Sequence, residues 1–197
     1  LWVATYGGGL FKFESESFTA VGNAELIGSN NIQAIYSDHV GNLWIGTDGA
    51  GLTRYKDGEF ERFTTAEGLS SNDVRTIAAD ANGHLWIGTS GGGLNVHAKG
   101  VITSYQKTGQ LSNDSVMSVL EDKERNLWIG TQSGLNQFRE GPITAYTTRA
   151  GLTHRITLGI LEDRDGVIWS GSLGGGLHSL RKGTFELFPD PTGLINK

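Results

Sequence analysis

Leu85-Trp86-Ile87-Gly88-Thr89 decides the fold, because this stretch recurs along the chain at a nearly constant spacing. Equivalent stretches occupy residues 1–5, 43–47, 127–131 and 168–172. They contain every tryptophan of the chain, at successive intervals of 42, 42, 42 and 41 residues: Trp2, Trp44, Trp86, Trp128 and Trp169. Self-similarity at such a period indicates a repeat architecture. We therefore treat 1–197 as a single region with approximate units 1–29, 30–71, 72–113, 114–154 and 155–197.

Each unit is predicted to contain four short strands. In the third unit the turn and apolar patterns predict strands at 74–79, 84–89, 94–98 and 101–106. Segments this short do not form stable helices, and four strands in about 42 residues, repeated radially, are typical of a β-propeller. The fold class is therefore all-β, a propeller of about five four-stranded blades. The first blade is expected to be incomplete, because Leu1 corresponds to Leu43, and the array is expected to be part of a larger propeller.

The tryptophans are expected to be structural. Along the second strand, Trp86 and Gly88 point to one side and their neighbours to the other. Neighbouring blades cover both faces of a blade, so we expect each indole to be buried between blades. The adjacent glycine is expected to leave room for an indole of the next blade. Burying an indole removes about 150–250 Å² from water, which corresponds to roughly 4–6 kcal/mol before entropy.

An aspartate stands six residues before the tryptophan in each complete unit, and it is also expected to be structural. Aspartate closes turns by accepting hydrogen bonds from backbone amides two or three residues further along the chain. A calcium site is disfavoured because each turn offers one carboxylate, whereas calcium takes about six to eight oxygens. No metal is predicted. The four aspartates are Asp38, Asp80, Asp122 and Asp163.

Composition excludes several classes of function. The net charge is −5 and no stripe of Lys or Arg occurs, which argues against a nucleic-acid surface. The absence of cysteine excludes disulfides, thiolate zinc sites and a cysteine nucleophile. No apolar run approaches the ~18 residues of a membrane span. The glycine-rich turns precede strands instead of helices, so they are not phosphate-binding loops, and no cofactor is predicted.

The unit resembles the two-component regulator propeller repeat. The resemblance rests on Asn72-Asp73-Val74, the aspartate turn, Leu-Trp-Ile-Gly-Thr and the following Gly91-Gly92-Gly93-Leu94. It implies the periplasmic sensor portion of a membrane-anchored bacterial protein, coupled to a histidine kinase, a hybrid kinase–regulator or a diguanylate cyclase. Many such sensors respond to glycan fragments. The family's usual sensor has two seven-bladed propellers followed by a small β-sandwich, and no segment here matches that sandwich. Open blade edges also suggest a homodimer.

A ligand site is predicted at one mouth of the central channel, where the loops before each first strand and after each second strand meet. These positions differ between units while their surroundings repeat, which is typical of a scaffold with a diversified face. They are polar and suit a small molecule or glycan, although the same residues could simply cap strands and turns. The candidates are Tyr6, Asp48, Asn72, Asp73, Asp114, Gln132, His154 and Arg155.

Catalysis is not expected, and no catalytic residue is assigned. Sialidase-type propellers carry loosely similar aspartate hairpins, but they need an arginine cluster, and only Arg155 lies on the predicted face. Streptogramin-lyase-like propellers need a channel histidine with magnesium, for which only His154 is a candidate. A passive protein-interaction scaffold is the third alternative.

Overall fold

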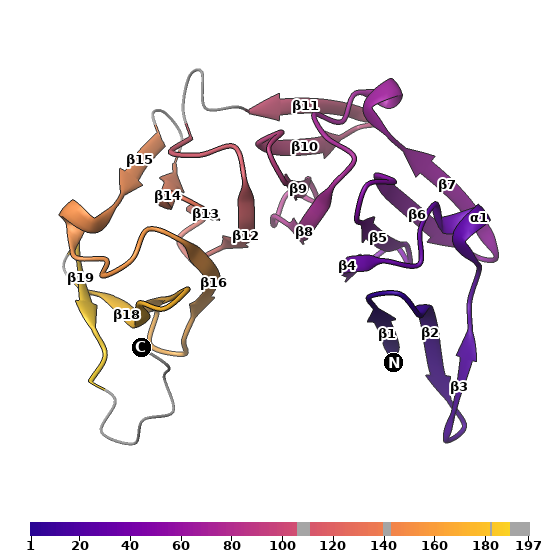
Figure 1. The fold of residues 1–197 in the computed structure, drawn as a ribbon, viewed down its shortest axis with the longest axis horizontal. Coiled ribbons are helices and arrows are strands. Elements are labelled where there is room, and N and C mark those ends of the chain that lie inside the picture. Colours follow the sequence, from indigo (N-terminus) through magenta and orange to yellow (C-terminus); the bar gives the residue numbers. More distant parts are fainter. Residues whose placement is uncertain (106–110, 140–142, 182, 190–197) are drawn as a thin grey trace.

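The computed structural model describes residues 1–105, 111–139, 143–181 and 183–189. Within these ranges the chain forms five antiparallel sheets, one with three strands and four with four, arranged as blades along an open arc (Figure 1). The first and fifth blades lie at the two ends of this arc. The all-β propeller prediction is therefore confirmed, including an incomplete first blade without an inner strand.

The strands follow one another in sequence order within every blade. The first blade contains β1 (Trp2–Thr5), β2 (Gly9–Glu14) and β3 (Ser17–Ala20). The second contains β4 (Ile32–Ser37), β5 (Leu43–Thr47), β6 (Leu52–Lys56) and β7 (Glu59–Phe63). The third contains β8 (Val74–Ala79), β9 (Leu85–Thr89), β10 (Leu94–Ala98) and β11 (Val101–Tyr105). The fourth contains β12 (Val116–Glu121), β13 (Leu127–Thr131), β14 (Gly134–Phe138) and β15 (Ile143–Tyr146). The fifth contains β16 (Thr157–Glu162), β17 (Ile168–Ser172), β18 (Gly176–Arg181) and β19 (Thr184–Leu187).

Short helical turns connect the outer strand of one blade to the inner strand of the next. They are α1 (Ala24–Ile27), η1 (Thr65–Glu67) and η2 (Thr148–Ala150). The inner strands β4, β8, β12 and β16 contact one another in succession and line the concave side of the arc (Figure 1). In the third blade the predicted strand boundaries agree with the structure to within one residue. Gln106, the predicted end of the last of these strands, lies outside the described residues.

The indoles lie between blades, and their burial depends on their place in the arc. Trp44, Trp86 and Trp128 are only 2–7% exposed, whereas the two tryptophans of the end blades are half-buried. Trp86 packs against Phe138 of the next blade, with ring centroids 6.4 Å apart. The end tryptophans are less buried because each lacks part of the surroundings that a complete interior blade provides.

The glycine beside each tryptophan has a different role from the one expected. A Cβ on Gly46 would lie 2.6 Å from Cγ1 of Val74, and a Cβ on Gly88 would lie 2.6 Å from Cγ1 of Val116. The neighbour in each case is the first residue of the next inner strand, and not an indole. The next blade's inner strand therefore passes directly over the glycine, while the indole meets a strand further from the centre.

The repeated aspartate binds both its hairpin and the indole. Asp122 Oδ1 accepts hydrogen bonds from the N–H groups of Glu124 and Asn126, at 2.9 and 2.8 Å. Its Oδ2 accepts the indole N–H of Trp128 at 2.7 Å. The other three aspartates bind their indoles in the same way, at 2.7–3.0 Å. The bond to the amide two residues on was predicted from the sequence, but the second amide lies four residues on, one further than predicted. The indole bond was not predicted, although the constant six-residue spacing was its signal.

These bonds favour the ionised form of Asp38, Asp80 and Asp163. Partial burial alone would raise the pKa of Asp38, but hydrogen bonds from Asn42 and Trp44 outweigh it and hold this pKa below its usual value. At Asp163 the hydrogen bond from Trp169 is the largest cause of a lowered pKa. The carboxylate form is favoured because it can accept from several donors at once.

Candidate functional site

Antiparallel pairing brings the start of each inner strand and the end of each second strand to one face, which we call the channel face. In the third blade Val74 pairs with Thr89 at this end. The residue after the second strand then donates its N–H to the residue before the inner strand, at 2.9–3.1 Å in all four complete blades. These bonds join Asp48 to Asn31, Ser90 to Asp73, Gln132 to Ser115 and Leu173 to Ile156.

Backbone bonds also cross between blades on the channel face. The N–H of Gly51 donates to the carbonyl of Asn72, and that of Gly93 donates to the carbonyl of Asp114, both at 2.8 Å. The side chain of Asn72 turns outward along the loop, where its Oδ1 accepts the N–H of Thr65 at 2.9 Å. The backbone carbonyls of Asn72 and Asp114 therefore link adjacent blades on the channel face.

Side chains from three blades meet on this face. The hydroxyl of Tyr6, from the first blade, donates to Oδ2 of Asp48 in the second blade at 2.7 Å. Gln33 Nε2 of the second blade donates to Oδ1 of Asp73 in the third at 2.9 Å. Arg75 Nη2 donates to the other oxygen of Asp73 at 3.1 Å. We call these five residues the channel cluster: Tyr6, Gln33, Asp48, Asp73 and Arg75.

Charges act between the Tyr6–Asp48 pair and the Gln33–Asp73–Arg75 group of the channel cluster. The hydrogen bond to Asp48 and the charge of that carboxylate raise the pKa of Tyr6, with a further contribution from Asp73 and an opposing one from Arg75. Tyr6 therefore stays a neutral hydroxyl that can donate a hydrogen bond. The side chains of Asp73 and Arg75 are 24% and 34% exposed, so solutes can reach them. Arg75 Nε has no hydrogen-bond partner among the described residues.

Gln33 and Arg75 were not predicted from the sequence, and a β-bulge explains why they reach the face. The pairing register shifts between Ile32 and Ala34, and between Val74 and Thr76. A bulge re-aims the side chain of the extra residue. The signal in the sequence was variation at the second position of each inner strand, which holds Gln33, Arg75, Met117 and Leu158.

Gln132, His154 and Arg155 do not join the channel cluster among the described residues. Gln132 and Arg155 are exposed, and among the described residues neither is hydrogen-bonded to the cluster. His154 Nδ1 accepts the N–H of Ile156 at 3.3 Å, so this ring caps its own loop. The structure thus brings Tyr6, Asp48 and Asp73 together, whereas the side chains of Asn72 and His154 bind the backbone of their own loops.

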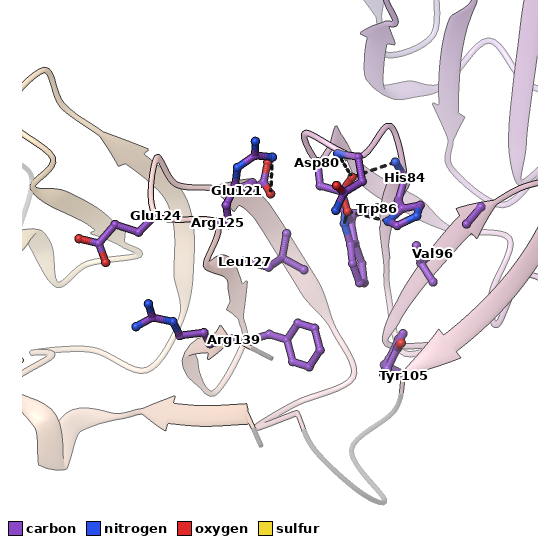
Figure 2. Close-up of a pocket in the computed structure, with 13 residues that line it drawn as sticks. Asp80, His84, Trp86, Val96, Tyr105, Glu121, Glu124, Arg125, Leu127 and Arg139 are labelled. Carbon is purple, nitrogen blue, oxygen red and sulfur yellow. Dashed lines mark hydrogen bonds and ion pairs between the residues drawn. The ribbon is translucent and has the colours of Figure 1, made fainter. Parts of the chain in front are cut away.

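The opposite face carries the aspartate hairpins and a groove of about 700 Å³ between the third and fourth blades (Figure 2). Trp86, Leu127 and Phe138 supply apolar walls. Two pairs of one basic and one acidic side chain lie on the rim: Arg125 with Glu121, and His84 with Asp80. In the described ranges no group of three or more His, Asp or Glu side chains is arranged to hold a metal ion. Nor does the described part contain a helix of the length and hydropathy that a bilayer span requires.

Three segments of this chain match a known family of repeats. Residues 27–49, 68–91 and 110–133 match the family described as two component regulator propeller. Each matched segment contains the loop before an inner strand, that strand, the aspartate hairpin and the second strand. The second, third and fourth blades of this chain are therefore similar to two-component regulator propeller repeats. No curated protein sequence matches it.

Solved structures share the arrangement of the propeller repeats at low sequence identity. The extracellular domain of BT4673 from B. thetaiotaomicron, described as a hybrid two component system, is 22% identical with a TM-score of 0.76. That alignment covers 95% of this chain and 29% of the other. The extracellular domain of BT3049 from the same organism is 21% identical, with a TM-score of 0.63 and coverages of 95% and 32%. This chain therefore spans less than a third of either domain.

A propeller enzyme is also similar in fold. Virginiamycin B lyase from Staphylococcus aureus is 15% identical with a TM-score of 0.74, and the alignment covers 98% of this chain and 67% of the lyase. Similarity at this level of identity concerns the propeller scaffold, because one propeller architecture carries many unrelated functions.

Proposed function

We propose that this chain is the ligand-sensing, non-catalytic propeller module of a bacterial signal-transduction sensor, and that the channel cluster recognises a small molecule or glycan. The two-component regulator repeats and the likeness to extracellular domains of hybrid two component systems support the sensor role. The same likeness supports a location outside the cytoplasm, in the periplasm, and a membrane-anchored parent.

The observation that carries the proposal is the hydrogen-bonded meeting of three blades in the channel cluster. Tyr6 and Asp48 join the first blade to the second, and Gln33 and Asp73 join the second to the third. A ligand that replaces these bonds contacts all three blades at once. Its binding energy can then bias how the blades pack, which is the differential interaction that a sensor needs.

The chemistry of the channel cluster suits a ligand rich in hydroxyl groups. Two carboxylates accept hydrogen bonds, while an amide, a guanidinium and a phenol donate them. Arg75 retains donors beyond the one that binds Asp73. Paired acceptors and donors within one cluster match vicinal hydroxyls, each of which donates and accepts.

A catalytic role has less support from this geometry. Asp48 and Asp73 each accept hydrogen bonds from neighbouring side chains, and His154 is engaged by its own backbone. Among the described residues no positioned nucleophile–base pair accompanies them on the channel face. The similarity to the lyase therefore concerns the propeller scaffold. The described residues of the channel face do not present a histidine arranged for catalysis.

The experiment is a thermal-shift screen of the chain against glycans and small acids, followed by the double variant D73N/R75Q. We expect at least one compound to stabilise the chain. Its affinity should fall at least about tenfold in the double variant, because the charged hydrogen bonds of both Asp73 and Arg75 are lost. His84→Gln, on the opposite face, is the matched control and should bind normally. A compound that binds both variants equally would refute the site, and turnover of that compound would refute the non-catalytic role.

The passive-scaffold alternative gives a different result in the same screen. A scaffold would retain a protein partner through purification and show no small-molecule shift. The homodimer through open blade edges stays a prediction, which sedimentation over a range of protein concentrations tests directly.

A further inference from the structure

A carboxylate bond repeats between successive blades on the hairpin face. Glu121 is the last residue of β12, and its Oε2 accepts the N–H of Ala81 in the preceding blade at 2.7 Å. Glu162 is the last residue of β16, and its Oε2 accepts the N–H of Lys123 at 3.0 Å. Each donor directly follows a hairpin aspartate. The side-chain carboxylate thus fills the gap between two blades and satisfies a backbone donor at their junction.

This bond is missing between the second and third blades. Ala79 holds the position of Glu121, because Ala79 pairs with Leu85 as Glu121 pairs with Leu127. The backbone donor in the same register is the N–H of His39, which directly follows Asp38. Within the described ranges this N–H has no hydrogen-bond partner. Of the three junctions between four-stranded blades, this one therefore presents the donor without the carboxylate.

A cavity of about 410 Å³ lies where the glutamate would be. Both Ala79 and His39 line it, as do Trp44 and Leu85, which provide an apolar wall. The cavity is large enough for a small organic molecule and not only for a carboxylate group. No comparable glutamate side chain reaches into it, because the alanine ends at Cβ.

Two cationic side chains line this cavity. Lys99 and Arg54 both line it, and in the described part of the chain Lys99 has no ion-pair partner. Arg54 is paired with Glu61 at 2.5 Å. The one acidic residue in the lining, Asp38, already accepts from four donors: the backbone N–H groups of Val40 and Asn42, the Asn42 amide and the Trp44 indole. Lys99 is therefore the cation available to a ligand.

We propose that this cavity binds a small organic carboxylate, which takes the place of the missing glutamate. The carboxylate accepts the N–H of His39 and pairs with Lys99, while its carbon skeleton lies against Trp44 and Leu85. Figure 2 shows the corresponding groove one junction further along, with Glu121 at its rim. The site lies on the opposite face from the channel cluster and is independent of the proposed sensing role.

The test uses sodium succinate as the probe at constant ionic strength, with sodium chloride as the reference. Titration of the 197-residue chain is followed by calorimetry and by the amide resonance of His39. We expect succinate to bind and to shift this resonance. Ala79→Glu supplies the carboxylate from within the chain, so we expect it to reduce succinate affinity at least about tenfold and to shift the His39 amide without ligand.

Three further variants, one of them a control, keep the test decisive if Ala79→Glu folds poorly. Lys99→Gln should weaken succinate binding at least about threefold by removing the cation, whereas Lys56→Gln, on the neighbouring blade's exposed strand end, should not change it. Glu121→Ala opens an equivalent gap at the next junction, and succinate should then shift the amide of Ala81 as well. The proposal is overturned if succinate leaves the His39 amide unmoved, or if Lys99→Gln binds succinate as tightly as the unaltered chain.

Discussion

A single carboxylate at each aspartate hairpin anchors both the turn and the indole beside it. Asp122 and Trp128 form the most buried of these pairs, at 7% and 2% exposed. An indole N–H buried without an acceptor is costly, because it has lost its hydrogen bonds to water. The aspartate therefore determines whether the tryptophan can be buried at all.

Replacing this carboxylate should destabilise the chain according to how deeply the indole is buried. We expect Asp122→Ala to cost about 2–3 kcal/mol, because the Trp128 N–H is then buried without a partner. Asp163→Ala is the matched control and should cost less, because Trp169 is half-buried and water can replace the acceptor. Urea denaturation measures both, and equal losses would contradict the explanation.

His178 is a second residue whose protonation state matters. It is fully buried, and its Nε2 accepts the N–H of Thr153 at 3.1 Å. In the preceding blades Asn95 and Asn136 hold the same position and accept from the corresponding loops. Burial lowers the pKa of His178 below its usual 6.5. The ring therefore substitutes for an amide only while Nε2 is unprotonated.

The folding stability of the chain should consequently fall in mildly acidic solution. As pH drops below about 6.5 the unfolded chain takes up a proton on His178 before the folded chain does, so stability decreases down to the folded pKa. His178→Asn should reduce the difference in urea midpoint between pH 7.5 and pH 5.5. Some dependence remains, because burial also lowers the pKa of His97. An unchanged pH dependence in the variant would exclude His178 as its source.

At the scale of the element, the second strand carries the contact between blades. Its glycine is needed because the next inner strand passes within contact distance: a Cβ on Gly88 would lie 2.6 Å from Val116 of β12, and 2.5 Å from Thr76 of β8 in its own blade. In the fifth blade a Cβ on Gly171 would meet nothing closer than 4.0 Å. The same sequence motif is thus crowded inside the arc and open at its end.

Alanine at these two glycines should therefore have unequal effects. We expect Gly88→Ala to cost about 1–3 kcal/mol through overpacking between the third and fourth blades. Gly171→Ala should change stability by less than about 0.5 kcal/mol. Thermal denaturation of both variants provides the comparison, and a large loss in Gly171→Ala would mean that another segment covers that face.

At the scale of the whole molecule, the blades form a linear series in which each contacts its neighbours. Repeat arrays of this kind are stabilised by nearest-neighbour interfaces, so blades with one interface are weaker than blades with two. The half-buried Trp2 and Trp169 mark the weaker ends, and the buried Trp86 marks the centre.

Hydrogen exchange should follow the same order. We expect amides of β8, β9, β12 and β13 to be protected most strongly, and those of β1 and β17 to exchange sooner through partial opening. Exchange followed by mass spectrometry resolves these strands. Uniform protection across the five blades would instead indicate that the chain unfolds as one unit.

The blade architecture could be predicted from the sequence because it depends on local periodicity. Strand length, turn residues and the spacing of the tryptophans all repeat, so the signals that predict each blade lie within its own unit of sequence. The channel cluster could be predicted only in part. Tyr6, Asp48 and Asp73 lie in loops whose variability was visible, whereas Gln33 and Arg75 depend on a bulge that changes the direction of one side chain.

The sequence by itself determined that four-stranded units succeed one another, and which face of them varies. Only the tertiary structure decided which variable residues meet, since Tyr6, Asp48 and Asp73 belong to three different blades. It also decided that Ala79 leaves a cavity, because that depends on the backbone of His39 in the preceding blade. The repeat is visible in the sequence because it is local, whereas contacts between repeats depend on how adjacent blades pack in three dimensions.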